Sequence, residues 1–278
     1  MPEFFQDLFK RKQVQVEDSE DHEEKPQQLP VVEEPSPSER LRSPLETPEE
    51  GVLESREKTD SKLLGGGCNT TVFIELKDDG SGIFKPKSGE NENLRENIRA
   101  GTYFQRERAA YLLDKFLGFD LVPPTVVREI DGEIGSFQQF IPDAQPGRRV
   151  EHSELDEAAI KQQLIKLWIF DCIIFNSDRH WSNFLVKDKK VYAIDNGLSF
   201  GDEIFYPHDS FFDVPIPPEI VEGIKKFLLW KEGRKICEDL LGELLSSEEV
   251  AACMRRIERI ASIIKQHGQV PRESELVF

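Results

Sequence analysis

The apolar positions between residues 71 and 140 predict a small β-rich unit that contains one helix. β-branched and aromatic residues gather in short runs separated by turn residues, as in the Asp-Asp-Gly-Ser-Gly stretch at 78–82, which is typical of strands. Residues 103–117 instead carry apolar side chains at helical spacing, and Gly118 is placed to end that helix. The predicted strands cover residues 71–76, 83–85, 122–130 and 134–140.

The pattern after residue 150 predicts a mostly helical unit. Residues 156–175 are apolar almost all round, which indicates a buried helix, and Cys172 within it is expected to be a small core residue. A short hairpin is predicted at residues 184–194, and Ser246 with Glu249 forms a capping box that opens the last helix. Two further helices are predicted at residues 220–229 and 235–245. A sheet-rich half followed by a helix-rich half predicts an α+β fold with two lobes.

The beginning of the chain has no helical or alternating apolar pattern between positions 14 and 60. It is acidic and rich in proline, so it cannot bury enough apolar surface to offset the entropy of ordering it. The predicted domains are therefore a disordered tail, 1–62, and a folded domain, 63–278, whose small lobe runs to about residue 141.

The first residues of this tail are an exception, because four apolar side chains would share one face of a short helix. Such a segment is either a frayed end with exposed apolar residues or a docking peptide for a partner groove or a membrane surface. The four residues are Phe4, Phe5, Leu8 and Phe9.

Composition and charge narrow the classes of function. The 278 residues carry a formal net charge of -17, which argues against nucleic acid as a partner, because a nucleic-acid binder needs a basic surface. No apolar run reaches the roughly 18–20 residues of a membrane-spanning helix, so no transmembrane segment is expected. The 4 cysteines are spaced neither as metal-binding pairs nor as a disulfide framework, which predicts a reducing, cytoplasmic location.

The candidate chemistry lies in and around the predicted hairpin. Asp178 is followed by Asn183 on the same loop, and Asp195 comes after the second hairpin strand. This is a phosphoryl-transfer arrangement, in which Asp178 accepts the proton of an attacking hydroxyl while Asn183 and Asp195 offer oxygens to a magnesium ion. A surface turn rich in Asp and Asn would not need the apolar strands of the hairpin. A calcium loop would need carboxylates at alternate positions of one short loop, which this stretch lacks.

The predicted small lobe supplies the partners that such chemistry needs. Lys85 ends a strand and Glu107 lies on the next helix, and a strand lysine paired with a helix glutamate positions the nucleotide phosphates in kinases. Alone, each would be an ordinary exposed side chain. A glycine-rich stretch before the first strand could bring backbone amides and hydroxyls to phosphate, although a linker end has a similar composition. The candidate residues of this stretch are Gly66, Gly67, Thr70 and Thr71.

These motifs carry a family resemblance. Residues 178–183, with the pattern Asp-Arg-His-x-x-Asn, and residues 194–197, Ile-Asp-Asn-Gly, resemble the phosphatidylinositol 3-/4-kinase-like branch of the kinase superfamily. Residues 84–86, 106–107 and 136–140 are similar to the type II phosphatidylinositol 4-kinase group in particular.

The resemblance implies a two-lobed, protein-kinase-like fold and an ATP- and magnesium-dependent kinase. It implies that Gln139, Phe140 and Ile141 link the lobes where adenine binds, and that His180 assists proton transfer or contacts the phosphate. Asn196 departs from the usual Asp-Phe-Gly, as it does in type II, HipA-toxin and secretory-kinase relatives.

The acceptor and the reaction stay open at this point. The 198–218 stretch, where an acceptor should lie, has no Lys or Arg and contains four acidic residues, which would repel an anionic phosphoinositide headgroup. A protein hydroxyl is therefore favoured over a lipid or small-molecule alcohol. An AMP-transferring enzyme and a nucleotide-binding pseudokinase scaffold are the alternatives to an active kinase.

Overall fold

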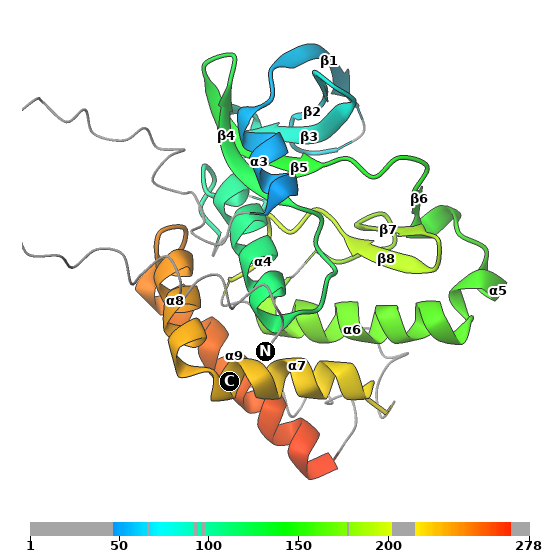
Figure 1. Ribbon diagram of the computed structural model, residues 1–278, viewed down its shortest axis with the longest axis vertical. Helices are drawn as coiled ribbons and strands as arrows, with labels where there is room; N and C mark the ends of the chain where they lie inside the picture. The colour runs from blue at the N-terminus through cyan, green and yellow to red at the C-terminus, as the bar shows by residue number, and fades with distance from the viewer. Residues whose placement is uncertain are drawn as a thin grey trace, which may run out of the picture.

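The computed structural model describes residues 47–65, 67–91, 94–95, 98–176, 178–201 and 215–267. They form two lobes, and Figure 1 shows a β-sheet lobe above a helical lobe. The predicted α+β fold with two lobes is confirmed. Within the described part of the chain, no helix has both the length and the apolar character that a membrane span requires.

The small lobe is built on one antiparallel sheet. Its buried face carries Phe84, Val126 and Phe137, which pack together in one apolar cluster. Lys85 is the residue before the last one of β3, and the register pairs it with Ser136 of β5. The strands are β1 (Lys58–Leu64), β2 (Thr71–Leu76), β3 (Gly80–Pro86), β4 (Thr125–Ile130) and β5 (Glu133–Gln139), in the order β1-β2-β3-β5-β4.

The helical lobe is organised around α6 (Ala158–Ile174), whose apolar side chains are buried on nearly all sides, as predicted. A second sheet, β6-β7-β8, lies between α6 and the small lobe (Figure 1). Its strands are β6 (Gln145–Pro146), β7 (Phe184–Lys187) and β8 (Lys190–Ala193). The other helices are α5 (His152–Leu155), α7 (Pro218–Leu229), α8 (Lys231–Gly242) and α9 (Ser247–His267). The predicted capping box opens α9, with Glu249 N donating to Ser246 Oγ at 3.2 Å.

Helix α4 (Tyr103–Leu117) has the predicted bounds and belongs to both lobes. Most of its side chains are buried, because it packs on β4 and β5 and also on α7 and α8. Gly118 ends it in the left-handed conformation with a φ of 68°, where glycine avoids a steric penalty. Arg106 on this helix donates to the Ser199 carbonyl at 2.7 Å and pairs with Glu249 on α9. The helix therefore ties the small lobe to the helical lobe.

The predicted boundary at residue 62 is wrong for residues 47–62. Helix α3 (Pro48–Ser55) begins at a capping box in which Glu50 N donates to Thr47 Oγ1 at 3.3 Å, and β1 adds to the edge of the sheet. Leu53 is 2% exposed, and Glu50 is buried against Arg108 of α4. The acidic composition hid this segment, because its order depends on partners far along the chain. Residues 1–46, including the apolar face of Phe4, Phe5, Leu8 and Phe9, lie outside the described residues.

Candidate active site

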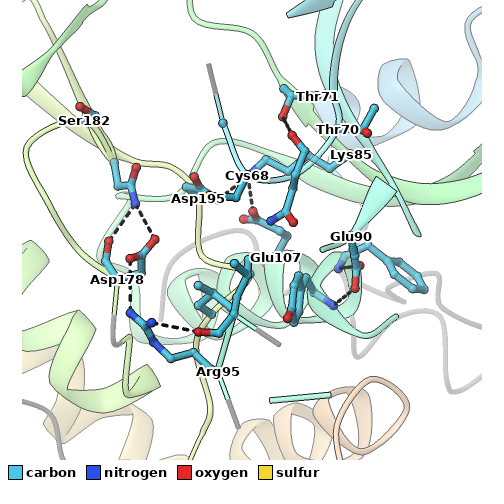
Figure 2. A pocket seen from close by; sticks show the side chains of 18 of the residues that line it. Cys68, Thr70, Thr71, Lys85, Glu90, Arg95, Glu107, Asp178, Ser182 and Asp195 are labelled. Carbon is cyan, nitrogen blue, oxygen red and sulfur yellow. Dashed lines mark hydrogen bonds and ion pairs between the residues drawn. The ribbon is translucent and has the colours of Figure 1, made fainter. Parts of the chain in front are cut away.

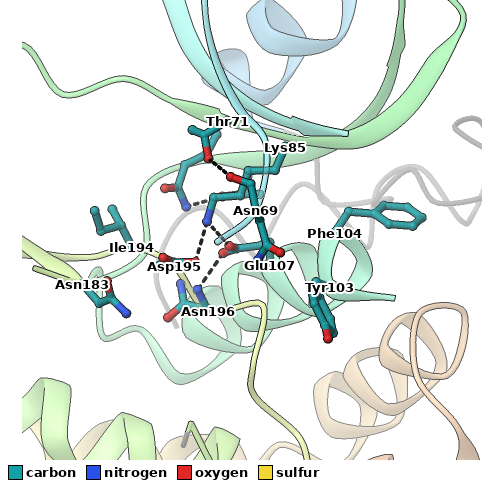
Figure 3. Close-up of polar contacts among 12 residues, drawn as sticks. Asn69, Thr71, Lys85, Tyr103, Phe104, Glu107, Asn183, Ile194, Asp195 and Asn196 are labelled. Carbon is teal, nitrogen blue, oxygen red and sulfur yellow. Dashed lines mark hydrogen bonds and ion pairs between the residues drawn. The ribbon is translucent and has the colours of Figure 1, made fainter. Parts of the chain in front are cut away.

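Lys85, Glu107 and Asp195 meet between the lobes, as Figure 3 shows. Lys85 Nζ lies 2.6 Å from Glu107 Oε1 and 2.8 Å from Asp195 Oδ1. β3 supplies the lysine, α4 the glutamate and the segment after β8 the aspartate, so elements of both lobes fix the arrangement. The Glu107 side chain is 4% exposed and that of Asp195 is 47% exposed, so the aspartate retains a surface that a ligand can reach.

The charges of these three groups stabilise one another. Burial alone would lower the pKa of Lys85, but the carboxylates of Asp195 and Glu107 outweigh burial and raise this pKa above its ordinary value. The Lys85 ammonium in turn holds the pKa of Asp195 below its ordinary value, against the effect of burial. At neutral pH Lys85 is therefore a cation and Asp195 an anion, the states that phosphate and metal binding require.

Asp178 and Asn183 lie on the loop between α6 and β7. Asn183 Nδ2 donates to the Asp178 carbonyl at 2.8 Å and to Asp178 Oδ2 at 3.4 Å. Ile194 N donates to the Asn183 carbonyl at 3.2 Å, so this loop runs beside the segment that carries Asp195. The Asp178 side chain is 36% exposed, which leaves its carboxylate within reach of a substrate hydroxyl.

Asn183 and Asp195 together fit a magnesium ion. The amide nitrogen of Asn183 is held by Asp178, which leaves its Oδ1 as the atom for a cation, and Asp195 adds a carboxylate in the same cavity. Among the residues that the structure describes, no group of three or more His, Cys, Asp or Glu could hold a metal ion by itself. Magnesium prefers oxygen ligands and usually takes only one or two carboxylates, with water and substrate phosphates as the rest.

Arg179 holds the parts of the site together, a role that the sequence analysis missed. Its guanidinium donates to both carboxylate oxygens of Asp171 on α6, at 2.9 and 3.0 Å. It also donates to the Ile194 carbonyl at 2.6 Å, to Asn196 Oδ1 at 2.6 Å and to the Asn183 carbonyl. A buried aspartate in the apolar second half of a helix, such as Asp171, indicates an internal ion pair and could have pointed to this arginine.

Asn196 lies where the resemblance to kinases places a phenylalanine, and in the structure it makes polar contacts. Its backbone N donates to Glu107 Oε2 at 2.9 Å, and its side-chain oxygen accepts from Arg179. Phenylalanine could not accept that second hydrogen bond. Through these two hydrogen bonds the buried Asn196 connects Glu107 of α4 to Arg179 of the loop.

Lys85, Glu107, Asp178, Asn183 and Asp195 line one cavity of about 460 Å³ between the lobes, shown in Figure 2. His180 is exposed at its edge, and its Nδ1 accepts from Ser182 N at 3.2 Å. Gly66 lies outside the described residues. The other predicted residues that line the cavity are Gly67, Thr70, Thr71, Lys85, Glu107, Asp178, His180, Asn183 and Asp195.

The glycine-rich stretch is tied to the segment that follows β3. Thr70 N donates to the Gly89 carbonyl at 2.9 Å, and Asn91 N donates to Asn69 Oδ1 at 2.8 Å. A Cβ on Gly89 would lie 2.3 Å from Thr70 Cβ, so only glycine allows this approach. These contacts hold the loop over the cavity.

The structure does not bring Gln139, Phe140 and Ile141 into the cavity of Lys85. They connect β5 to the helical lobe and line a separate hollow of about 700 Å³ beside the end of α4. Gln139 N donates to the Pro124 carbonyl at 2.8 Å and Phe140 N to the Ser81 carbonyl at 3.1 Å, so both donors are already used within the protein.

Comparisons with known sequences give distant relatives, and no known family profile matches the chain. The chain is 26% identical over 217 aligned positions to Protein Rv2133c of Mycobacterium tuberculosis, a match that covers 64% of this chain and 75% of that protein. It is 30% identical over 162 positions to phosphatidylinositol 4-kinase gamma 5 of Arabidopsis thaliana, covering 48% of this chain. It is 26% identical over 185 positions to the plant's phosphatidylinositol 4-kinase gamma 1, covering 54%. These matches span only 25% and 32% of the two plant proteins.

Solved structures with a similar fold include kinases. The chain matches the Golgi casein kinase with a TM-score of 0.51 at 18% sequence identity, covering 78% of this chain and 73% of that one. It matches the Golgi casein kinase with Mn/ADP bound with a TM-score of 0.52 at 18% identity, covering 84% and 81%. The chain therefore has a two-lobed, kinase-like fold.

Proposed function

We propose that this protein is an ATP- and magnesium-dependent kinase that transfers the γ-phosphate of ATP to a hydroxyl acceptor. The observation that carries the proposal is the convergence of Lys85 and Glu107 from one lobe with Asp178, Asn183 and Asp195 from the other in a single cavity. The kinase-like fold and the similarity to plant lipid kinases support the same reaction.

In the proposed reaction, the acceptor oxygen forms a bond to the γ-phosphorus while the bond from that phosphorus to the β–γ bridging oxygen breaks. The electron pair of the broken bond leaves with ADP, and the hydroxyl proton passes to Asp178. Lys85 holds the nucleotide phosphates, and Glu107 keeps the ammonium in place at 2.6 Å. Asn196 and Arg179 hold Glu107 and the loop of Asp178 in a fixed relation.

Magnesium, when bound, neutralises charge on the nucleotide phosphates. Asp195 and the Oδ1 of Asn183 are the side-chain atoms that would hold it. The pairing of Asp195 with Lys85 keeps this carboxylate ionised before nucleotide arrives.

The acceptor that we propose is a protein hydroxyl. Support comes from the acidic 198–218 sequence, which disfavours an anionic lipid headgroup, and from the fold shared with the Golgi casein kinase. The similarity to the plant phosphatidylinositol 4-kinases favours the second candidate, a phosphatidylinositol hydroxyl.

Isotope transfer from ATP tests the reaction and the acceptor together. The full chain is incubated with Mg²⁺ and ATP labelled at the γ- or the α-phosphate, in the presence of casein or of phosphatidylinositol vesicles. Label transferred from the γ position to either acceptor, and lost in Asp178→Asn, is the expected result. Asp188→Asn, the same change on the exposed β7–β8 turn, is the matched control.

Retention of α-label on protein would instead indicate AMP transfer. Nucleotide binding without transfer of either label, to these acceptors or to the protein itself, would indicate a pseudokinase. Either result would overturn the proposed kinase activity.

A further inference from the structure

Arg95 lies on the segment between β3 and α4 and reaches the candidate base Asp178. Its Nη2 lies 3.5 Å from Asp178 Oδ1, and a dashed line joins the two side chains in Figure 2. Both residues line the cavity that also contains Lys85 and Asp195. A permanent cation therefore lies beside the carboxylate to which the proposed reaction assigns the hydroxyl proton.

The backbone near Arg95 is anchored to both lobes. The Glu90 carboxylate accepts from the backbone N of Gly101 at 2.6 Å and of Phe104 at 2.8 Å, at the start of α4. Farther along, Ile98 is 3% exposed and packs with Leu198 of the helical lobe, and Leu94 packs against the same cluster. These contacts fix where the arginine side chain starts, so its approach to the cavity follows from the fold.

The positive charge of Lys85 alone cannot balance the negative charge of a nucleotide triphosphate in this cavity, and Arg95 can supply a second positive charge. Lys85 carries one positive charge and already shares it with two carboxylates at 2.6 and 2.8 Å, whereas a nucleotide triphosphate brings several negative charges. Arginine presents a planar fork of donors that matches phosphate oxygens, and such donors are well suited to the charge of a transferring phosphoryl group. The long pair with Asp178 joins two side chains that are about one-third exposed, 33% and 36%, so a phosphate can replace the carboxylate at little cost.

We propose that Arg95 is a catalytic residue that pairs with Asp178 when no nucleotide is bound and binds the γ-phosphate when ATP is present. The exchange places the guanidinium on the phosphoryl oxygens and releases the Asp178 carboxylate to the acceptor hydroxyl. This inference rests on the proposed function, because it needs the γ-phosphate to lie beside Asp178.

Nucleotide binding separates the inference from the activity itself. Binding of ADP and of a non-hydrolysable ATP analogue, each with Mg²⁺, is measured by calorimetry for the wild-type chain, Arg95→Met, Arg95→Lys and Arg99→Met. Arg99 is an exposed arginine of the same segment and is the matched control. We expect Arg95→Met to weaken binding of the ATP analogue by about 10-fold or more while ADP binding changes less than about 2-fold.

Turnover gives the second readout. An arginine on the transferring phosphoryl group contributes about 10³–10⁵ in kcat in related chemistry, so a loss toward that range is expected in Arg95→Met. Arg95→Lys keeps the charge without the fork, so it should recover analogue binding more fully than kcat. Equal weakening of ADP and analogue binding, or values equal to those of Arg99→Met, would overturn the role of Arg95. If the wild-type chain binds nucleotide but transfers no γ-phosphate, the proposed function fails. The ratio of analogue affinity to ADP affinity still tests, independently of turnover, whether Arg95 binds the γ-phosphate.

Discussion

Two clusters of ion pairs share helix α4, and they differ in how much water reaches them. The front cluster, Lys85, Glu107 and Asp195, lies at the cavity, with Lys85 22% and Asp195 47% exposed. The back cluster, Glu50, Arg108 and Lys115, joins α3 to α4 with N–O distances of 2.6 Å, and its Glu50 and Arg108 are 0% and 1% exposed. Similar pairs at similar distances therefore occur on different faces of one helix.

The difference shows that ion pairs of the same kind can stabilise a fold when they are buried, or remain available to a ligand when they are exposed. In the back cluster, burial raises the pKa of Glu50, but Arg108 and Lys115 together overcome it and the net pKa is lowered. No ligand can compete for the pair of Glu50 and Arg108, because protein covers both side chains. In the front cluster the aspartate is open, so phosphate and metal can share its charges. Glu107 belongs to the front cluster at the cavity, and its neighbour Arg108 belongs to the buried back cluster. Two adjacent residues of α4 therefore connect the candidate site to an internal ion pair.

Removing the open carboxylate should give the largest effect on activity. Asp195→Ala deletes the charged oxygen that would hold magnesium, so we expect turnover to fall by about 10³-fold or more, while the unfolding free energy changes little. Turnover with Mg²⁺ and ATP and urea denaturation measure the two quantities. Asn183→Ala should lose less activity, because that ligand is neutral. Undiminished turnover in Asp195→Ala would contradict the metal role.

Neutralising the proposed base tests the second aspartate of the cavity, Asp178. Asp178→Asn keeps the shape but cannot accept the hydroxyl proton, so kcat should fall by about 10²–10⁴-fold. Nucleotide affinity should stay nearly unchanged, because Lys85 and the metal hold the phosphates. Calorimetry with ADP and Mg²⁺ beside steady-state kinetics distinguishes the outcomes. Loss of ADP binding would make Asp178 a metal ligand or a structural residue instead.

Breaking the back cluster should affect stability more than chemistry. Glu50→Gln leaves the buried Arg108 guanidinium and the Lys115 ammonium without their counter-charge, which typically costs about 3–5 kcal/mol of unfolding free energy. Urea denaturation of this variant beside Glu49→Gln, an exposed neighbour on the same helix turn, measures the loss. Equal stability of the two variants would show that α3 does not stabilise α4 through this pair.

The second carboxylate of α4, Asp114, sharpens the comparison, because it is buried without a direct ion pair among the described residues. Burial raises the pKa of Asp114 to about 7, although its Oδ2 accepts from the backbone N of Val122 and Leu121. Asp120 raises this pKa further, and Lys166 lowers it. The folded state therefore binds a proton that the unfolded state releases near the ordinary pKa.

Stability should consequently fall as the pH rises from about 4 to 7, with a slope of at most about 1.4 kcal/mol per pH unit from this group. Asp114→Asn should remove that slope, because its amide oxygen still accepts both backbone donors and carries no charge. Unfolding free energies of the wild type and the variant at pH 5, 6 and 7 provide the measurement. Parallel pH profiles would contradict the raised pKa.

Local patterns were sufficient for much of the fold. Helix α4 and strand β2 begin and end where the apolar spacing predicted, because each carries its periodicity within its own residues. The structure also gathers Lys85, Glu107, Asp178, Asn183 and Asp195 in one cavity, which the motif spacing had grouped. Their chemical roles remain proposals.

Long-range contacts are what the sequence could not predict. Glu50 reaches Arg108, 58 positions away, and no periodicity in an acidic, proline-rich stretch marks such a partner. Arg179 and Asn196 make their contacts only once α6, the loop and the end of β8 are assembled. The lobe link at Gln139 came from resemblance alone, and its geometry depends on how the lobes pack.

The contacts of Arg106 also limit how the two lobes can move. This buried guanidinium, rooted in α4, is held by the Ser199 carbonyl and by Glu249 at the first turn of α9. Wide rotation of the lobes would separate this guanidinium from both of these acceptors, so large opening at this edge is disfavoured. If the proposed kinase activity holds, nucleotide exchange should then depend on displacement of the glycine-rich loop, which hydrogen bonds at Thr70 and Asn69 connect to the segment after β3. The site would therefore open by movement of the glycine-rich loop, while the edge at Arg106 keeps the two lobes together.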